Sequence, residues 1–296
     1  AGYASALQYV SEAKQVHIRE KWAWTEDLQL AYKDAERAIS RAMGPANKAE
    51  EIRIVWMASS AVQFDKTEDC ASVASRHPGW PYIGTRGWIG ACLACLREVE
   101  LGCLTFSSDV VSINRVAKSV TLCLTVSKSD PAGRGVKRTF GCRCSRVNGN
   151  DRNVCCYCCF ESMIDMQESR LGFGQDAEEA KRMPLVGTTS NPGKFVSKNC
   201  MVDALQHFAT FVKDHVLDAK DLDVEGVSGH SLRRAGIKYY ARKGLKFPTI
   251  QWLARHSSDA TKGYIEEAME ECPDADRRLD EADSFADQVI EMRSKV

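Results

Sequence analysis

The sequence predicts an α+β protein that is mainly helical and contains one small antiparallel β-sheet. Segments towards both ends of the chain repeat apolar residues at helical spacing. A middle region, residues 104–140, is instead rich in alternating or β-branched residues and contains the turn sequence Pro-Ala-Gly-Arg-Gly. No internal repeat is apparent, which argues against a solenoid.

The beginning of the chain favours two helices followed by a domain boundary. Apolar residues recur at helical spacing in residues 3–13 and 28–39, with a break at residues 22–25. Glycine, proline and asparagine then interrupt the pattern just before residue 49, where a new helix is expected to begin. We therefore expect a small helical domain over residues 1–45 and a larger domain over residues 46–296.

The larger domain is expected to open with helices and continue into the sheet. A helix is predicted over residues 49–64, and the strongly apolar residues 87–104 predict a buried helix that ends near Gly102. Three strands are predicted over residues 104–113, 119–129 and 136–140.

The last third of the chain is expected to be helical again. Ser197 is a suitable N-cap for a helix over residues 198–216. Another helix is predicted from about Ser231 to Lys243, with Gly244 as its C-terminal stop. A short helix follows over residues 247–254. An amphipathic helix is predicted near the end of the chain, from the apolar residues Leu279, Ala282, Phe285, Val289 and Met292.

Composition indicates an intracellular protein with no membrane-spanning segment. Hydrophobic residues make up 44% and charged residues 27% of the chain, and no apolar run approaches the length that crosses a bilayer. The opening residues do not resemble a secretory signal, so we expect that the chain begins inside a larger protein. If the source is eukaryotic, the expected compartment is the nucleus.

The charge balance argues against a simple nucleic-acid-binding surface. Lys plus Arg equals Asp plus Glu at 40 each, whereas proteins that neutralise phosphates usually have a basic excess. The charges are unevenly distributed, however: the charged residues from Arg233 to Lys246 are all basic, and Glu266 to Asp287 is densely acidic. We therefore interpret the zero net charge as the sum of a basic segment and an acidic segment, so that acidic residues mask a basic face.

The thirteen cysteines fall into groups with different expected roles. Four lie in apolar runs and are assigned to packing: Cys92, Cys95, Cys103 and Cys123. A Cys-rich insert at about residues 141–160 contains a CxC and a CxxC pair, whose spacing suits a structural zinc site. The expected ligands are Cys142, Cys144, Cys155 and Cys158, with Cys156 and Cys159 left over. Reduced, metal-free cysteines are the alternative.

A cluster of reactive residues lies in the segment from Gly229 to Ala268. His230 and Arg233 are three residues apart at a predicted helix start, so both project from one face beside the positive end of the helix dipole. That face suits an oxyanion. His256 and Tyr264 follow in the same segment. Each feature alone is unspecific, because a lone tyrosine is more often half-buried packing than a nucleophile.

Together, these residues resemble the catalytic domain of the tyrosine recombinase and phage-integrase family. Its signature of Arg, Lys, His-x-x-Arg, His or Trp, and Tyr is matched in order by Arg97, Lys128, His230 and Arg233, His256, and Tyr264. A glutamate three residues after the first arginine also matches. The segment HSSDATKGY is similar to the WxSDAxxxY pattern of recombinases from eukaryotic mobile elements. The resemblance covers about residues 50–268 as the catalytic domain, and it implies that residues 1–45 are part of a helical core-binding domain.

The resemblance implies a DNA recombinase or integrase that works through a 3′-phosphotyrosine intermediate. It implies that Tyr264 is the nucleophile, that Arg97, Arg233 and His256 stabilise the phosphate, that His230 assists proton removal, and that Lys128 protonates the leaving 5′-hydroxyl. The implied partners are double-stranded DNA and further copies of the chain in a synaptic tetramer. No cofactor is required, and the sequence has no P-loop. Two alternatives stay open, a non-catalytic DNA-binding relic of a mobile element and a type IB topoisomerase-like nicking and closing enzyme.

Overall fold

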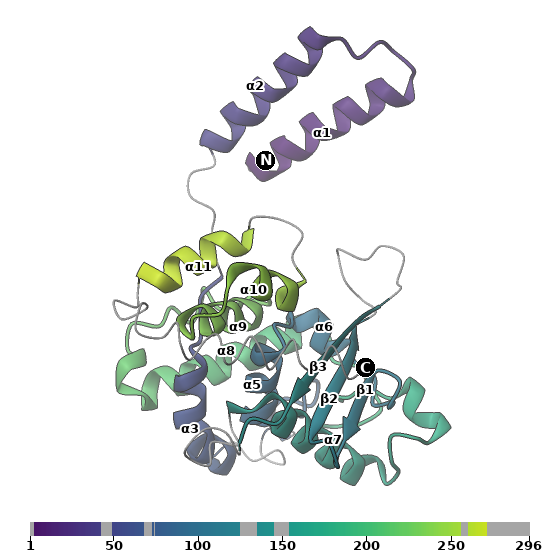
Figure 1. The fold of residues 1–296 in the computed structure, drawn as a ribbon, viewed down its shortest axis with the longest axis vertical. Coiled ribbons are helices and arrows are strands. Elements are labelled where there is room, and N and C mark those ends of the chain that lie inside the picture. The colour runs from purple at the N-terminus through teal and green to yellow at the C-terminus, as the bar shows by residue number, and fades with distance from the viewer. Residues whose placement is uncertain are drawn as a thin grey trace. The chain divides into compact units, whose positions relative to one another are not determined.

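The computed structural model describes residues 3–42, 49–67, 73, 75–124, 135–144, 154–255 and 260–270 of the 296-residue chain. The chain divides into two compact units, Ala1–Lys48 and Ala49–Val296. Both are mainly helical, and the second also contains a three-stranded antiparallel sheet (Figure 1). Within the described residues, no helix combines the length and apolar character that a bilayer crossing requires.

The first unit is a pair of packed helices, α1 (Tyr3–Arg19) and α2 (Glu26–Ala42), separated at the predicted break. Thr25 begins α2, because its hydroxyl accepts a hydrogen bond from the Leu28 backbone amide at 3.2 Å. Lys14 joins the two helices: its ammonium donates to Gln29 at 3.0 Å and lies over the ring of Tyr32, 4.6 Å from its centroid.

The sheet lies in the second unit and is antiparallel, as predicted, although its first strand is shorter than the predicted residues 104–113. Strands β1 (Val111–Asn114), β2 (Ser119–Leu124) and β3 (Val136–Gly141) are neighbours in that sequence. Val120, Leu122 and Leu124 are buried and alternate with less buried residues along β2, so one face of the sheet contributes to the core. Helix α7 (Cys156–Leu171) packs against β2 and β3.

The remaining helices gather around α5 (Thr85–Leu93), which contacts α3, α7 and α9 and has eight of its residues buried. Glycines allow these close approaches. A Cβ on Gly236 of α9 would lie 1.9 Å from the Cys92 carbonyl oxygen, and one on Gly90 would lie 2.9 Å from Cys159. The other helical elements are α3 (Ile54–Thr67), α6 (Glu98–Gly102), η2 (Glu178–Arg182), α8 (Lys198–His215), η3 (Leu217–Ala219), α9 (Ser231–Arg242), α10 (Phe247–Ala254) and α11 (Ala260–Glu270).

The apolar segment 87–104 differs from the prediction, because it does not form one helix ending near Gly102. Helix α5 ends at Leu93 and α6 begins at Glu98. Between them Cys95 adopts a left-handed backbone conformation with φ 49°. This reversal takes the Cys95 carbonyl out of the helical hydrogen-bond ladder, and two buried arginines bind it instead.

The predicted helices in the last third of the chain are confirmed where the structure describes them. The Ser197 hydroxyl accepts from the Cys200 amide at 3.2 Å and caps α8, and Gly244 adopts φ 79° just after α9. Helix α10 begins and ends at the predicted residues, 247 and 254. The amphipathic helix predicted over residues 279–292 lies outside the described residues.

Candidate active site

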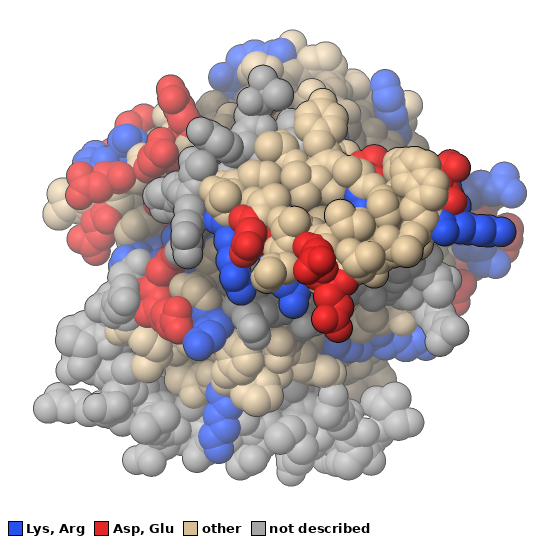
Figure 2. Space-filling view, turned by 90° about the horizontal axis from the view of Figure 1, so that it is seen from above, with Lys and Arg blue, Asp and Glu red and all other residues tan. Residues whose placement is uncertain are grey.

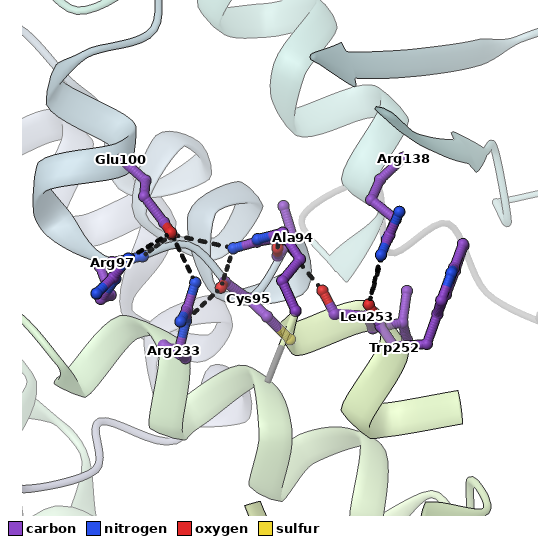
Figure 3. A network of polar contacts seen from close by, with 9 residues as sticks. Ala94, Cys95, Arg97, Glu100, Arg138, Arg233, Trp252 and Leu253 are labelled. Carbon is purple, nitrogen blue, oxygen red and sulfur yellow. Dashed lines mark hydrogen bonds and ion pairs between the residues drawn. The ribbon is translucent and has the colours of Figure 1, made fainter. Parts of the chain in front are cut away.

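Two of the arginines singled out in the sequence meet on one buried carboxylate, that of Glu100 (Figure 3). Arg97 precedes α6, and its guanidinium donates to Glu100 at 3.0 Å while its backbone amide donates at 2.8 Å. Arg233, from the first turn of α9, donates to both carboxylate oxygens at 2.8 and 2.7 Å. Two residues that are far apart in the sequence are thereby held at one point.

A third guanidinium, from Arg255, completes this cluster and was not anticipated from the sequence. Arg255 follows α10 directly, has a left-handed backbone with φ 56°, and is only 7% exposed. It donates to Glu100 at 3.0 Å and to the Cys95 carbonyl at 2.8 Å, and Arg233 donates to the same carbonyl at 2.9 Å. No local pattern in the sequence distinguishes Arg255 from the other basic residues around it.

The Glu100 cluster, meaning Glu100 with Arg97, Arg233 and Arg255, carries excess positive charge. Burial raises the pKa of Glu100, but the neighbouring Arg255 and Arg233 outweigh it and hold this pKa below its usual value. Burial lowers the pKa of Arg233 to about 10 although Glu100 opposes the shift, so the guanidinium stays charged at neutral pH. Arg97 is the most accessible of the three, with 16% of its side chain exposed, and it presents this charge to solvent.

His230 immediately precedes α9 and shares the electrostatic environment of the cluster. Partial burial lowers its pKa; Glu98 counteracts this, whereas Arg97 and Arg233 lower the pKa further. The imidazole is consequently neutral at neutral pH and can accept a proton. The local chain is fixed, since the His230 carbonyl accepts from the Arg234 amide at 3.0 Å.

Tyr264 lies on α11 and is half-buried against the core. Its ring faces Arg234, whose guanidinium carbon is 5.7 Å from the ring centroid. Glu267, one turn later, accepts from Arg234 at 2.7 Å and lies 3.7 Å from the Lys238 ammonium. These contacts attach the helix of Tyr264 to the helix that begins with His230 and holds Arg233.

Four of the six predicted site residues can thus be located. Arg97 and Arg233 converge on Glu100, and His230 lies within electrostatic reach of both. Among the described residues, no hydrogen bond joins Tyr264 to this cluster, and its helix α11 packs against both α9 and α10. Lys128 and His256 lie outside the described residues; in sequence, Lys128 falls between β2 and β3, and His256 directly follows Arg255.

The expected basic face on residues 233–246 is not what the structure shows. Within that run Arg233 and Lys238 are buried, and Arg234 and Arg242 are partly buried in ion pairs with acidic residues. In the view of Figure 2, basic and acidic side chains of the described residues are interspersed, and neither sign gathers into a continuous patch. The basic run contributes mainly to internal ion pairs.

The predicted metal ligands come together in space. The sulfur atoms of Cys142, Cys144, Cys155 and Cys158 all lie within 4.8 Å of one another, a grouping that could hold a metal ion. All four are free cysteines. Burial raises the pKa of Cys158 to about 11. Burial acts in the same direction on Cys155, but backbone amides directed at its sulfur outweigh it and lower its pKa.

Comparisons with known proteins do not determine a family. No family model matches the sequence, and no curated protein matches it. Among solved structures, the fold is similar to that of the XerA recombinase with a TM-score of 0.42 and 14% sequence identity, covering 92% of this chain and 82% of that chain. A likeness at this level does not decide what the chain does.

Proposed function

We propose that the chain cleaves and rejoins double-stranded DNA through a covalent 3′-phosphotyrosine on Tyr264. The observation that carries the proposal is the Glu100 cluster. Its buried carboxylate accepts hydrogen bonds that orient the guanidinium groups of Arg97 and Arg233 near a neutral His230. The N-terminal end of α9 supplies both residues, His230 as its N-cap and Arg233 from its first turn, and Glu267 links the helix of Tyr264 to α9.

In the proposed reaction, the Tyr264 phenol oxygen attacks the phosphorus and the bond from phosphorus to the 5′-oxygen breaks. His230 accepts the phenol proton, and the departing 5′-oxygen takes a proton from Lys128 and becomes a hydroxyl. Arg97 and Arg233 bind the non-bridging oxygens as negative charge builds on them, with His256 as a further donor. Attack by a 5′-hydroxyl on the phosphotyrosine reverses these steps and reseals a strand.

No cofactor enters this transesterification, because the phosphoester energy is kept in the covalent intermediate. A zinc ion at the cysteine cluster is proposed only as a structural element. The proposed partners are duplex DNA and identical protomers in a synaptic tetramer, in which strands are exchanged between two duplexes.

Covalent trapping tests the proposal. The probe is a pool of 5′-labelled duplexes with randomised sequence, each carrying a bridging 5′-phosphorothiolate so that the cleaved thiol cannot reseal. We expect a labelled protein band that survives denaturation, that disappears in Tyr264→Phe and that persists in Tyr239→Phe, which removes a hydroxyl from α9 instead. Absence of an adduct, or its persistence in Tyr264→Phe, would refute the proposed nucleophile.

Two other functions are distinguished by the same preparation. The internal pairing of the α9 basic residues favours a DNA-binding relic or a weak DNA binder, for which filter binding would be positive and trapping negative. Relaxation of supercoiled DNA at protein concentrations where the chain is monomeric would instead indicate a type IB topoisomerase-like enzyme. Strand exchange between two labelled duplexes is the outcome that the recombinase proposal requires.

A further inference from the structure

We propose that Cys142, Cys144, Cys155 and Cys158 bind one zinc ion, and that this ion fixes β3 and α7 in the arrangement that supports α10 and the Glu100 cluster. The four residues come from two elements. Cys142 and Cys144 directly follow β3, whereas Cys155 precedes α7 and Cys158 lies in its first turn. The cluster therefore joins the end of a strand to the beginning of a helix.

The distances match a single tetrahedral ion. Zinc–sulfur bonds of about 2.3 Å at tetrahedral angles place neighbouring sulfurs about 3.8 Å apart. The Cys142–Cys158 and Cys142–Cys155 sulfur pairs are both 3.9 Å apart, and the Cys144–Cys158 pair is 3.4 Å apart. These separations exceed the roughly 2.05 Å of a disulfide, so the sulfurs surround a common centre without pairing covalently.

The structure also resolves which cysteines of the CCxCC sequence are ligands. Cys156 and Cys159 are buried at the packing interface of α7, and Cys159 lies against the position of Gly90 in α5. Cys155 and Cys158 turn instead towards the end of β3. The helical periodicity of α7 separates the two pairs, because residues three apart share a face whereas adjacent residues do not.

The donor set favours zinc over other ions. Magnesium and calcium prefer oxygen ligands, whereas four thiolates in a tetrahedron select zinc or iron. The Cys155 sulfur also accepts a hydrogen bond from the Arg143 backbone amide at 3.4 Å, a contact that stabilises a metal-bound thiolate and orients it. With all four positions taken by protein sulfur, such a site is structural.

A chain of contacts leads from this site to the Glu100 cluster. On β3, the Arg138 guanidinium donates to the Trp252 carbonyl of α10 at 3.2 and 2.9 Å and stacks on the Trp252 ring at 3.9 Å (Figure 3). Arg255 follows α10 and binds Glu100. We therefore expect loss of the ion to loosen first β3 and then α10.

Metal analysis of the purified full chain tests the zinc site without any measurement of activity. We expect about one zinc per chain, and after exchange for cobalt we expect the absorption bands of tetrahedral Co(II) with thiolate ligands. Cys144→Ser and Cys158→Ser should lose the ion, whereas Cys156→Ala and Cys159→Ala, matched controls from the same segment, should retain it. If a ligand variant fails to fold, native mass spectrometry of the parent chain before and after chelation gives the same stoichiometry.

Hydrogen exchange tests the coupling of the ion to the sheet and α10. Removal of zinc by a chelator should accelerate amide exchange in residues 136–144 by about tenfold or more and should also accelerate it in residues 247–255. Arg138→Ala should retain zinc and protection in β3 but lose protection in α10. A chain without zinc, with iron in its place, or with unchanged exchange after chelation would overturn the inference. Zinc binding does not depend on Tyr264, so Tyr264→Phe should keep its zinc. Failure of the proposed function would therefore leave all of these zinc measurements unchanged.

Discussion

Removal of the Glu100 carboxylate charge by Glu100→Gln should destabilise the protein more than a change at any neighbouring acid. The carboxylate is 2% exposed and accepts hydrogen bonds from three guanidinium groups, on Arg97, Arg233 and Arg255. Breaking one buried ion pair typically costs about 3–5 kcal/mol, because the partner charge is left without compensation. Three partners place this variant at the upper end, about 4–5 kcal/mol, a large part of a typical total stability of about 5–15 kcal/mol.

Urea denaturation followed by tryptophan fluorescence measures this loss, since Trp88 is buried in the central helix α5. A matching fall in Tm of roughly 8–20 °C is expected for a unit of this size. Glu98→Gln is the control. Glu98 is also buried on α6, but one of its oxygens has no hydrogen-bond partner among the described residues, and Lys198 is 4.0 Å from the other. Equal losses in the two variants, or a loss below about 1 kcal/mol at Glu100, would refute the reasoning.

Two further signatures distinguish loss of charge from loss of packing in Glu100→Gln. The uncompensated guanidiniums should bind sulfate, which at a hundredfold excess over its Kd would restore about 2.7 kcal/mol in the variant and little in the parent. The parent should also be more acid-sensitive. Because the folded-state pKa of Glu100 is lowered, its stabilisation is present above the unfolded value of about 4.3 and is lost as pH falls through the folded value. The variant should lack this component.

Three other variants have defined outcomes. Arg255→Gly should be more stable than Arg255→Ala by about 1 kcal/mol in free energy of unfolding, and should therefore have the higher Tm. Both variants lose the guanidinium, but only glycine adopts φ 56° without strain. Equal Tm values would argue against strain at this position. The single-turnover rate of adduct formation should fall as the pH drops through the lowered pKa of His230, because the protonated imidazole cannot accept the phenol proton. His230→Gln should react more slowly, and its pH profile should lack this step. Gly236→Ala should lower the free energy of unfolding, measured by urea denaturation, by about 3 kcal/mol or more, since its Cβ would meet a carbonyl oxygen at 1.9 Å. Gly263→Ala should be neutral or stabilising, because its Cβ would meet no atom of the described residues within 4 Å.

Much of the fold was predictable because its signals are local. Alternation along β2 and the cap at Ser197 each depend on a few consecutive residues, and both are present in the structure as predicted. The helix break at Cys95 could not be predicted in this way. An apolar run continues through it, and the left-handed residue is held by Arg233 and Arg255, which lie far along the chain from it.

The candidate site also combines features that local sequence predicts with features that depend on distant segments. The spacing of His230 and Arg233 is enough to indicate an anion-binding helix start, but the role of Arg255 depends on a carboxylate 155 positions away. The spacing of the cysteines likewise indicates four ligands, while only the helical phase of α7 separates them from Cys156 and Cys159. Convergence of distant segments is a property of packing, which one sequence without its fold does not reveal.

The basic residues of α9 are paired with acidic residues of the same chain, so most of the charge of this basic segment is not exposed. Lys238 is 2% exposed and lies 3.2 Å from Glu51, which also accepts two hydrogen bonds from Arg242 at 2.6 and 2.7 Å. Arg234 pairs with Glu267 on α11. Desolvated charges of this kind must be compensated by partners at close range. Their pairing fastens α9 both to the segment before α3 and to the helix of Tyr264.

This use of charge changes what the neutral composition implies. A surface that binds phosphates must leave its cations accessible, whereas three basic residues of the run, Arg234, Lys238 and Arg242, are engaged with acidic groups of the same chain. Their contribution to the proposed reaction is therefore geometric. Arg234 and Lys238 hold the helix of the nucleophile against the helix that supplies His230 and Arg233. Other cations of the protein or of its assembly would therefore have to bind the DNA backbone.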